Sequence, residues 1–339
     1  MPSRHPAVGR RHPRSCALAI LTPCVQYGDV APITFEPLYM TRVWGGRALE
    51  QVYGRELPDE GPYGESWEIV DRHEQQSVVN AGPLKGATLH DLWTQQREEL
   101  FGPGLPGERF PLLIKILDAR DNLSIQVHPP AKIAPRLSGD PKTEMWYIAR
   151  ASPGAKLHLG LRNGVTRRQF ENALSEGTVG QLVHTVKPRA GESIFIPSGR
   201  LHAIGAGLLI YEIQENSDTT YRVFDWNRSG LDGTPRDLHV QESMACIDFQ
   251  DFEPSMNPPG DTTLASCECF IVDKFDLPAG AGLGNPDPGR FSIVTVVDGE
   301  LRSSDDRRFG AGCVLLLPRG GTPLEAVSGA SVLQTSIPG

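Results

Sequence analysis

Short apolar segments, separated by glycine- and proline-containing turns, dominate the chain from about residue 33 onward. Their short length and their β-branched and aromatic residues favour strands over helices. The Trp44-Gly45-Gly46 tripeptide is expected to form a turn among the strand-like pieces of residues 33–80. Further strands are expected at 66–70, 111–119, 123–128, 181–186, 192–196 and 208–222.

Two segments have the helical period instead. The first begins at Thr88, a residue type that caps helix N-termini, and continues with an apolar stripe to Leu100. The second begins at Thr166, which is spaced from Gln169 as in a capping box, and ends at Gly177. The sequence therefore predicts two short amphipathic helices in a chain of strands.

Composition and charge agree with this pattern and exclude some classes of partner. The 36 glycines and 29 prolines favour many turns over a helical bundle. A formal net charge of -8 argues against binding to nucleic acid or to an anionic membrane surface. No apolar run approaches the ~20 residues that a membrane-spanning helix needs. A small anionic substrate remains possible, because local lysines and arginines can outweigh the global charge within one cleft.

The six cysteines show no zinc-ribbon spacing. The closest pair, Cys267 and Cys269, flanks one residue of an expected strand, so both side chains should point the same way. We interpret the cysteines as buried thiols of a reducing compartment, which favours a cytoplasmic protein. Residues 1–32 hold four arginines and a short apolar stretch, and they are expected to be a disordered extension or an over-long annotated start.

The segment from Gly191 to His202 combines a strand, a turn and a histidine: Gly-Glu-Ser-Ile-Phe-Ile-Pro-Ser-Gly-Arg-Leu-His. An apolar run that enters a Pro-Ser-Gly turn is typical of a strand–turn–strand unit. The spacing G-x5-P-x-G-x2-H resembles the second signature motif of cupin barrels. His202 is therefore a candidate metal ligand directed into the mouth of a small barrel.

The same frame recurs from Gly312 to Gly320, with apolar residues filling it in both copies. Counting on, the position equivalent to His202 is Pro323, and no histidine follows His239. We infer that the chain contains two related units, of which the second has lost its metal ligands.

The expected fold is therefore mostly β: two cupin-type (jelly-roll) β-barrels, with a few short helices packed on the first. Residues 33–250 are expected to form the catalytic, metal-binding barrel. Residues 251–339 are expected to form a degenerate second barrel without metal ligands.

Three residues are candidate partners for His202. Gln126 and His128 stand at positions i and i+2 of one expected strand, so their side chains face the same side of the sheet. Glu144 stands at the head of another strand, in Lys-Thr-Glu-Met-Trp-Tyr-Ile. Two imidazoles, a carboxylate and an amide oxygen suit Zn²⁺ but also Fe²⁺, Mn²⁺ or Co²⁺. For Gln126 the alternative is a strand amide bonded to a neighbour.

Several motifs, in this order, resemble those of the type I mannose-6-phosphate isomerases (phosphomannose isomerases), in their short bacterial form. The motifs are YGESWEIVDR (63–72), FPLLIKILDA (110–119), SIQVHPP (124–130), KTEMWYI (142–148), PSGRLHAIGAG (197–207) and ENSDTTYRVFDWNR (215–228). The resemblance implies one zinc ion per chain, bound by Gln126, His128, Glu144 and His202. It also implies reversible isomerisation of mannose 6-phosphate and fructose 6-phosphate.

An aldose–ketose isomerisation moves a proton between C1 and C2 through an enediol, so it needs a proton shuttle and groups that hold the phosphate. The resemblance assigns Arg222 a substrate or transition-state role. Glu212 and Lys142 are the candidates for acid–base work. Lys115, Lys142 and Ser124 are candidate sugar or phosphate contacts, and Ser124 shares a strand face with Gln126 and His128.

Two other functions use the same ligand set. An Fe²⁺-dependent dioxygenase could use the histidines and the carboxylate, but such enzymes have no general need for a cluster of phosphate-binding cations. A non-catalytic sugar-phosphate-binding cupin could retain the metal, but the chain carries candidate catalytic residues and no DNA-binding motif. The sequence leaves open the metal, the proton-shuttling residue, and the choice between monomer and homodimer.

Overall fold

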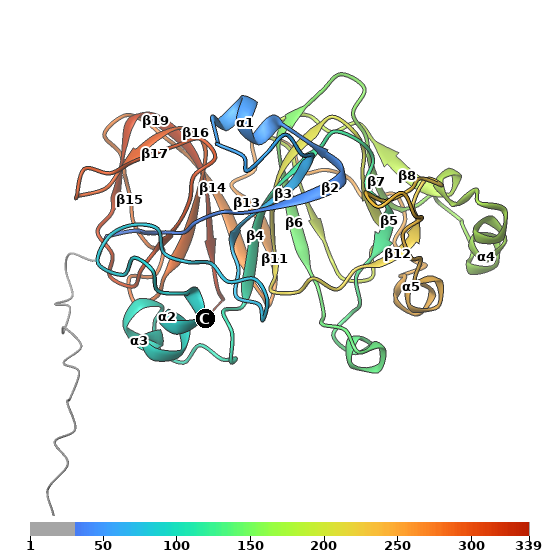
Figure 1. Cartoon of the computed structure of the whole chain (residues 1–339), viewed down its shortest axis with the longest axis horizontal. Helices are drawn as coiled ribbons and strands as arrows, with labels where there is room; N and C mark the ends of the chain where they lie inside the picture. The colour runs from blue at the N-terminus through green and yellow to red at the C-terminus, as the bar shows by residue number, and fades with distance from the viewer. Residues whose placement is uncertain (1–30, 339) are drawn as a thin grey trace, which may run out of the picture.

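A computed structural model describes residues 31–338, and the expected N-terminal extension lies mostly outside the described residues. The described chain is mostly β, with three antiparallel sheets side by side and a few short helices (Figure 1). None of the described helices has the length and apolar character required to cross a membrane.

The central sheet has six strands and is covered on both faces. In spatial order its strands are β2 (Leu38–Gly46), β3 (Tyr63–Ile69), β4 (Leu112–Ala119), β11 (Leu208–Glu215), β6 (Glu144–Ala151) and β9 (Ser193–Ile196). Every residue of β4 is buried, as its almost unbroken apolar sequence requires. On β4, Ile114 and Ile116 pack toward the C-terminal sheet. Leu117 packs on the other side, and Lys115 shares its face by strand alternation.

The two sheets that flank the central sheet lie on the right and left of Figure 1. On the right, the five-stranded sheet runs β12 (Tyr221–Phe224), β5 (Ile125–Val127), β10 (His202–Ile204), β7 (Leu157–Leu161) and β8 (Val183–Val186). On the left, the eight-stranded sheet runs β1 (Ile33–Thr34), β18 (Val314–Leu317), β16 (Ser292–Arg302), β19 (Leu324–Ser336), β14 (Ile271–Leu277) and β13 (Thr263–Ser266). In that sheet β15 (Gly282–Leu283) pairs with β19 and β17 (Arg308–Gly310) pairs with β16.

The helices are short and lie at the margins of the sheets. They are α1 (Ala48–Tyr53), α2 (Leu89–Gln95), α3 (Arg97–Leu100), α4 (Arg167–Glu176) and α5 (Val240–Cys246), with 3-10 turns η1 (Ala134–Leu137) and η2 (Val179–Gln181). The capping box at Thr166 and the left-handed Gly177 that ends α4 confirm the predicted helix. The helix predicted from Thr88 also starts with a capping box, but it breaks at Gln96 into α2 and α3.

The two glycine–proline frames have the same local structure. Gly191 and Gly312 have φ angles of +88° and +87°, and each comes shortly before a strand that ends at a proline. Such φ values strain any residue with a Cβ, which explains why glycine stands at both positions. The two frames therefore share a backbone conformation at their first glycine, and the duplication stays a prediction.

Three local expectations were wrong. Trp44–Gly46 end strand β2 rather than forming a turn, and Gly45 is required because a Cβ there would lie 2.4 Å from the backbone nitrogen of Gly64. The strand expected over 208–222 is two strands, β11 and β12, because the chain leaves the central sheet and joins the five-stranded one. Cys267 and Cys269 lie in the turn between β13 and β14, not in a strand, and they are half-buried.

Candidate metal centre and adjoining cleft

Paired strands bring three of the predicted side chains together. Gln126 of β5 lies directly opposite His202 of β10 on one side and Arg222 of β12 on the other. Residues paired in this way have their side chains on the same face of the sheet. His128 follows β5 by one residue and keeps to the face of Gln126 by strand alternation. Glu144 comes from the central sheet, as the first residue of β6.

His128, Glu144 and His202 form a buried cluster whose potential ligand atoms all lie within 4.8 Å of one another. His128 Nε2 is 3.4 Å from Glu144 Oε2, and His202 Nε2 is 3.5 Å from Glu144 Oε1. Each of the three side chains is almost fully buried. One carboxylate and two imidazole nitrogens therefore converge on one point between the two sheets.

Backbone carbonyls fix the orientation of both imidazoles. The Nδ1–H of His128 donates to Thr219 O at 2.9 Å, and that of His202 donates to Arg200 O at 2.9 Å. Each Nε2 then carries a lone pair toward Glu144. Metal-bound histidines commonly use the second ring nitrogen in this way.

The electrostatics of the cluster also suit a cation. Burial, reinforced by the charge of Lys142 and opposed by that of Glu144, lowers the pKa of His128 to about 4. Burial likewise lowers the pKa of His202. Both rings are therefore neutral at pH 7. His128 Nε2 and both oxygens of Glu144 lack a hydrogen bond of good geometry among the described residues. A divalent cation would satisfy all three atoms, and the donor set fits Zn²⁺.

Gln126 is half-buried at the edge of this cluster. Its Nε2 lies 3.3 Å from His202 Nε2, and Ser124 Oγ lies 3.3 Å from its Oε1. The amide is thus within reach both of the candidate metal position and of its strand neighbour. Its role as a fourth ligand stays a prediction.

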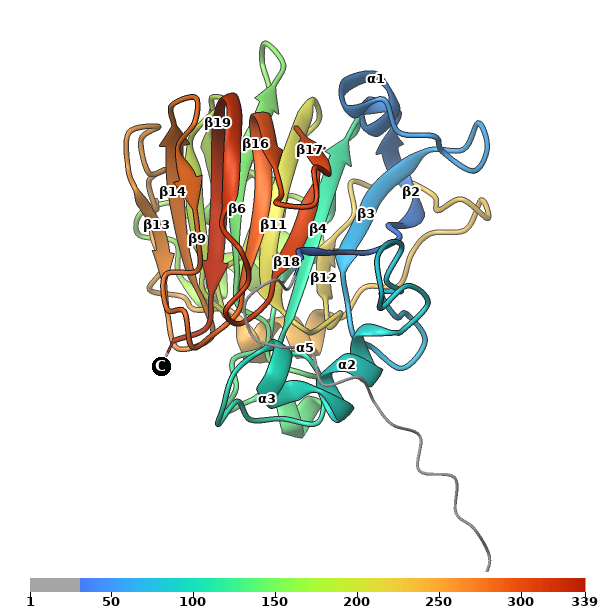
Figure 2. The same cartoon turned by 90° about the vertical axis from the view of Figure 1, so that its left-hand side faces the viewer.

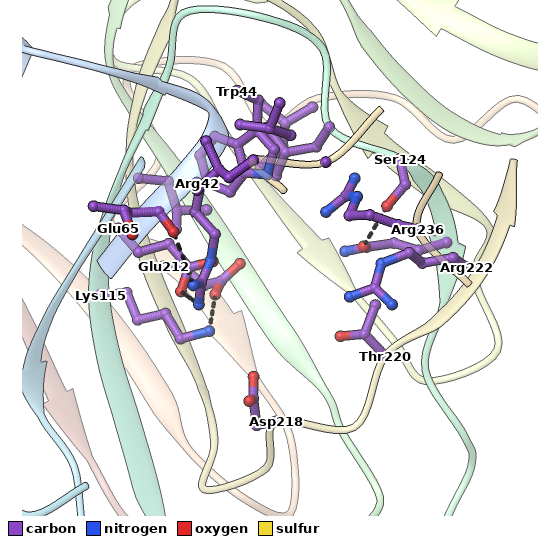
Figure 3. Close-up of a pocket in the computed structure, with 18 of the residues that line it drawn as sticks. Arg42, Trp44, Glu65, Lys115, Ser124, Glu212, Asp218, Thr220, Arg222 and Arg236 are labelled. Atoms are coloured by element: carbon purple, nitrogen blue, oxygen red, sulfur yellow. Dashed lines mark hydrogen bonds and ion pairs between the residues drawn. The ribbon is translucent and has the colours of Figure 1, made fainter. Parts of the chain in front are cut away.

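Figure 3 shows a cleft, of about 680 Å³. It adjoins the cluster, because its lining residues Gln126 and Lys142 lie 3.3 Å from His202 and 3.1 Å from Glu144. Six predicted site residues line it: Lys115, Ser124, Gln126, Lys142, Glu212 and Arg222. The structure therefore brings together every predicted substrate or catalytic residue beside the three buried candidate ligands.

Lys115 and Glu212 line one wall of the cleft and belong to a row of side chains across the central sheet. Lys115 lies opposite both Glu212 and Trp67, and Glu212 lies opposite Trp146. Lys115 Nζ is 3.2 Å from Glu212 Oε1, and Trp146 Nε1 donates to Glu212 Oε2 at 2.8 Å. The Lys115 ammonium also lies 5.1 Å over the Trp67 ring. This row holds the Glu212 carboxylate in one orientation.

Two further cations face the cleft from other elements. Burial alone would lower the pKa of Lys142, but the carboxylates of Glu144 and Glu212 raise it, so Lys142 stays protonated. Lys142 Nζ is 3.1 Å from Glu144 Oε2. Burial and the charge of Arg236 lower the pKa of Arg222, yet a guanidinium stays charged at neutral pH. Arg222 makes no side-chain hydrogen bond or ion pair within residues 31–338 in this structure, so its charge is available to a ligand.

The structure adds lining residues that the sequence did not single out, mainly Arg42, Glu65, Asp218 and Arg236 (Figure 3). Burial would raise the pKa of Glu65, but Lys115 and Arg42 together lower it to about 2. Arg42 holds both oxygens of Glu65, at 2.9 and 3.1 Å. Glu65 and Asp218 stand within the quoted motifs. Arg42 and Arg236 stand in no motif. The pairing of β2 with β3 places Arg42 at the cleft, and hydrogen bonds to Asp225 hold Arg236 there.

Comparison with known proteins identifies the family of this chain. Residues 33–145 match the catalytic domain of phosphomannose isomerase type I. The mannose-6-phosphate isomerase ManA of Bacillus subtilis is 37% identical over 301 residues, which are 85% of this chain and 93% of that protein. The chain belongs to the type I phosphomannose isomerase family. A mannose-6-phosphate isomerase of Streptococcus mutans is 34% identical over 281 residues, 79% of this chain and 86% of that protein.

A solved structure supports membership of the phosphomannose isomerase family at the level of fold. The mannose 6-phosphate isomerase of Bacillus subtilis superposes with a TM-score of 0.81 at 31% identity, covering 91% of this chain and all of that one. The family match at 33–145 contains Gln126, His128 and Glu144. His202 and Arg222 lie beyond it, and the strand pairing with Gln126 places them at the same site.

Proposed function

We propose that the protein interconverts D-mannose 6-phosphate and D-fructose 6-phosphate through an enediol intermediate. The observation that carries the proposal is the buried His128–Glu144–His202 cluster beside a cleft with several cations. Family membership supports the same reaction, because close relatives are named mannose-6-phosphate isomerases.

The proposed cofactor is one Zn²⁺ per chain, held by His128, Glu144 and His202, with Gln126 as the fourth ligand. Two neutral imidazoles and a carboxylate are a usual donor set for catalytic zinc, although other divalent metals accept it too. When bound, the metal supplies a Lewis acid that polarises the sugar carbonyl without redox chemistry.

The phosphate and the developing enediolate are the two anionic groups that the cleft must hold. Arg222 makes no ion pair among the described residues, so its guanidinium can bind a dianionic phosphate or an enediolate. Lys142 and Ser124 lie on the same side of the cleft as the ligands and are proposed as further substrate contacts. Lys115 is already paired with Glu212, so we assign it to the sugar rather than to the phosphate.

Glu212 is the proposed proton shuttle, and Lys142 is the alternative. The base takes a proton from C2 of mannose 6-phosphate and returns it to C1 of the enediol. Lys115 and Trp146 hold the Glu212 carboxylate at the cleft wall, which favours a fixed position relative to the two carbons. Lys142 is protonated, so it would first have to release a proton to act as the base.

We also propose the finer architecture expected from the sequence. The central and five-stranded sheets would form a catalytic cupin barrel over residues 33–250, and residues 251–339 would form a second barrel without metal ligands. The matching φ angles of Gly191 and Gly312 support this duplication. We also propose a cytoplasmic location and a monomeric or homodimeric state.

Turnover of mannose 6-phosphate by zinc-loaded protein tests the reaction, with fructose 6-phosphate detected by a coupled assay. Mannose without its phosphate is the matched control, and we expect it to react far more slowly because Arg222 then has no phosphate to bind. Absence of turnover with zinc confirmed on the protein would overturn the proposed function. Binding of mannose 6-phosphate without conversion would point to a sugar-phosphate-binding protein instead.

A further inference from the structure

Outside the cleft, two thiols meet at one edge of the eight-stranded sheet. Cys267, Glu268 and Cys269 form the turn between β13 and β14, and these two strands lie at the left in Figure 2. Cys267 N donates to Phe270 O at 3.0 Å, which closes the turn. Both thiols are half-buried and Glu268 is exposed, so small solutes can reach the pair.

The two thiols contact each other and a carboxylate. The side chains of Cys267 and Cys269 interact with each other, and the side chain of Cys269 also interacts with Glu215. Cys267 Sγ in addition lies 3.5 Å from Phe270 O. The interaction with Cys269 lowers the pKa of Cys267, and the same interaction raises the pKa of Cys269. Cys267 is therefore the thiol that more readily becomes a thiolate, with a second thiol in contact with it.

Glu215 connects this pair to the cleft. Its Oε2 accepts a hydrogen bond from Thr143 N at 2.7 Å, and its backbone N donates to Thr143 O at 3.0 Å. Thr143 stands between Lys142 and Glu144, which are a cleft cation and a candidate metal ligand. Glu215 thus holds this segment on one side and accepts the Cys269 thiol on the other.

We propose that Cys267 and Cys269 are a peroxide-reactive dithiol whose oxidation to an intrachain disulfide removes the thiol partner of Glu215 and thereby slows the reaction in the cleft. The contact between the thiols, the exposure of the turn and the double contact of Glu215 with Thr143 carry this proposal. Its second half rests on the proposed isomerase function.

The chemistry needs only hydrogen peroxide as oxidant. The Cys267 thiolate attacks one peroxide oxygen, the O–O bond breaks, and the departing hydroxide takes a proton to become water. The Cys269 sulfur then attacks the sulfenic acid of Cys267, forms the S–S bond and expels a second water. Two thiols lose two electrons and two protons in total, and one peroxide becomes two waters. A dithiol reductant reverses the step by thiol–disulfide exchange.

Mass spectrometry of the full chain after peroxide treatment tests the disulfide. Digestion with trypsin and chymotrypsin separates the pair from Cys246, because Phe249 and Phe252 lie between them. We expect the peptide carrying Cys267 and Cys269 to lose the mass of two hydrogens and to regain it with dithiothreitol. Cys313→Ser should behave as wild type. Sulfinic acid on Cys267, or no change, would overturn the dithiol.

Activity of the same samples tests the connection to the cleft. Oxidation should lower kcat/KM for mannose 6-phosphate by roughly two- to tenfold, as is usual for coupling through packed neighbours, and reduction should restore it. Cys269→Ser keeps an O–H donor for Glu215, so it should resist peroxide and retain its activity. A disulfide that leaves kcat/KM unchanged would overturn the connection. An inactive reduced enzyme with zinc bound would refute the isomerase function instead.

Discussion

Replacing Lys115 by methionine is expected to destabilise the fold by about 3–5 kcal/mol, because the change leaves a buried carboxylate without its cation. Lys115 Nζ lies 3.2 Å from Glu212 Oε1, and the two side chains are only 4% and 5% exposed. Lys115 also helps to keep Glu65 ionised. Methionine keeps an apolar side chain against Trp67, so the measured loss of stability reports the missing charge rather than missing packing.

Lys274 provides the matched control for this change. Its Nζ is closer to its partner, at 2.6 Å from Asp276 Oδ2, but the Asp276 side chain is 73% exposed. Exposed pairs are worth at most about 1 kcal/mol, so Lys274→Met should cost less than Lys115→Met despite the shorter distance. Urea unfolding at pH 7, with metal removed from all samples, measures both free energies.

A double variant separates the charge from the side chain. Lys115→Met combined with Glu212→Gln should recover much of the lost stability, because the uncompensated carboxylate is then absent. The reasoning is refuted if Lys115→Met costs no more than Lys274→Met. It is equally refuted if the costs of Lys115→Met and Glu212→Gln simply add.

Three further predictions follow from other parts of the molecule. Arg222→Met should lower kcat/KM for mannose 6-phosphate by roughly 10- to 100-fold, because one or two charge-assisted hydrogen bonds to the substrate are lost. The Tm of this variant should stay close to that of the wild type. An unchanged kcat/KM would exclude Arg222 from substrate binding. Thr166→Ala should destabilise α4 by about 1 kcal/mol in thermal unfolding, whereas Thr166→Ser should cost little. The pKa of Glu65 is lowered from 4.5 to about 2. Ionised Glu65 therefore adds roughly 3 kcal/mol to the free energy of unfolding at pH 7, and this contribution should disappear as the pH falls from 4.5 to 2. Glu65→Gln should therefore narrow its stability gap to wild type over that range in urea titrations, and a constant gap would contradict the assignment.

Local signals predicted much of the secondary structure. The capping box at Thr166 and the stop at Gly177 defined α4 to the residue. Strand alternation correctly placed Gln126 and His128 on the same face of the strand. The pairing of β10 with β5 then put His202 beside Gln126. The prediction of a turn at Trp44–Gly46 was wrong because glycine occurs both in turns and where two backbones approach closely. Only the neighbouring strand β3 shows that the second reason holds here.

The walls of the cleft depended on pairings that a sequence does not display. Lys115 and Glu212 are far apart in the chain, and their ion pair follows from the register of β4 against β11. Arg42 reaches the cleft only because β2 pairs with β3, which carries Glu65. The Cys267–Cys269 contact likewise required a turn where a strand was expected.

Zinc content and turnover measured on the same samples of wild type and His202→Ala test the central claim most directly. The wild type should bind one zinc ion per chain and convert mannose 6-phosphate to fructose 6-phosphate. His202→Ala, although folded by circular dichroism, should lose both the bound zinc and the turnover, since it removes one of the three converging ligand atoms. Turnover at the wild-type rate in His202→Ala would contradict the proposed metal centre.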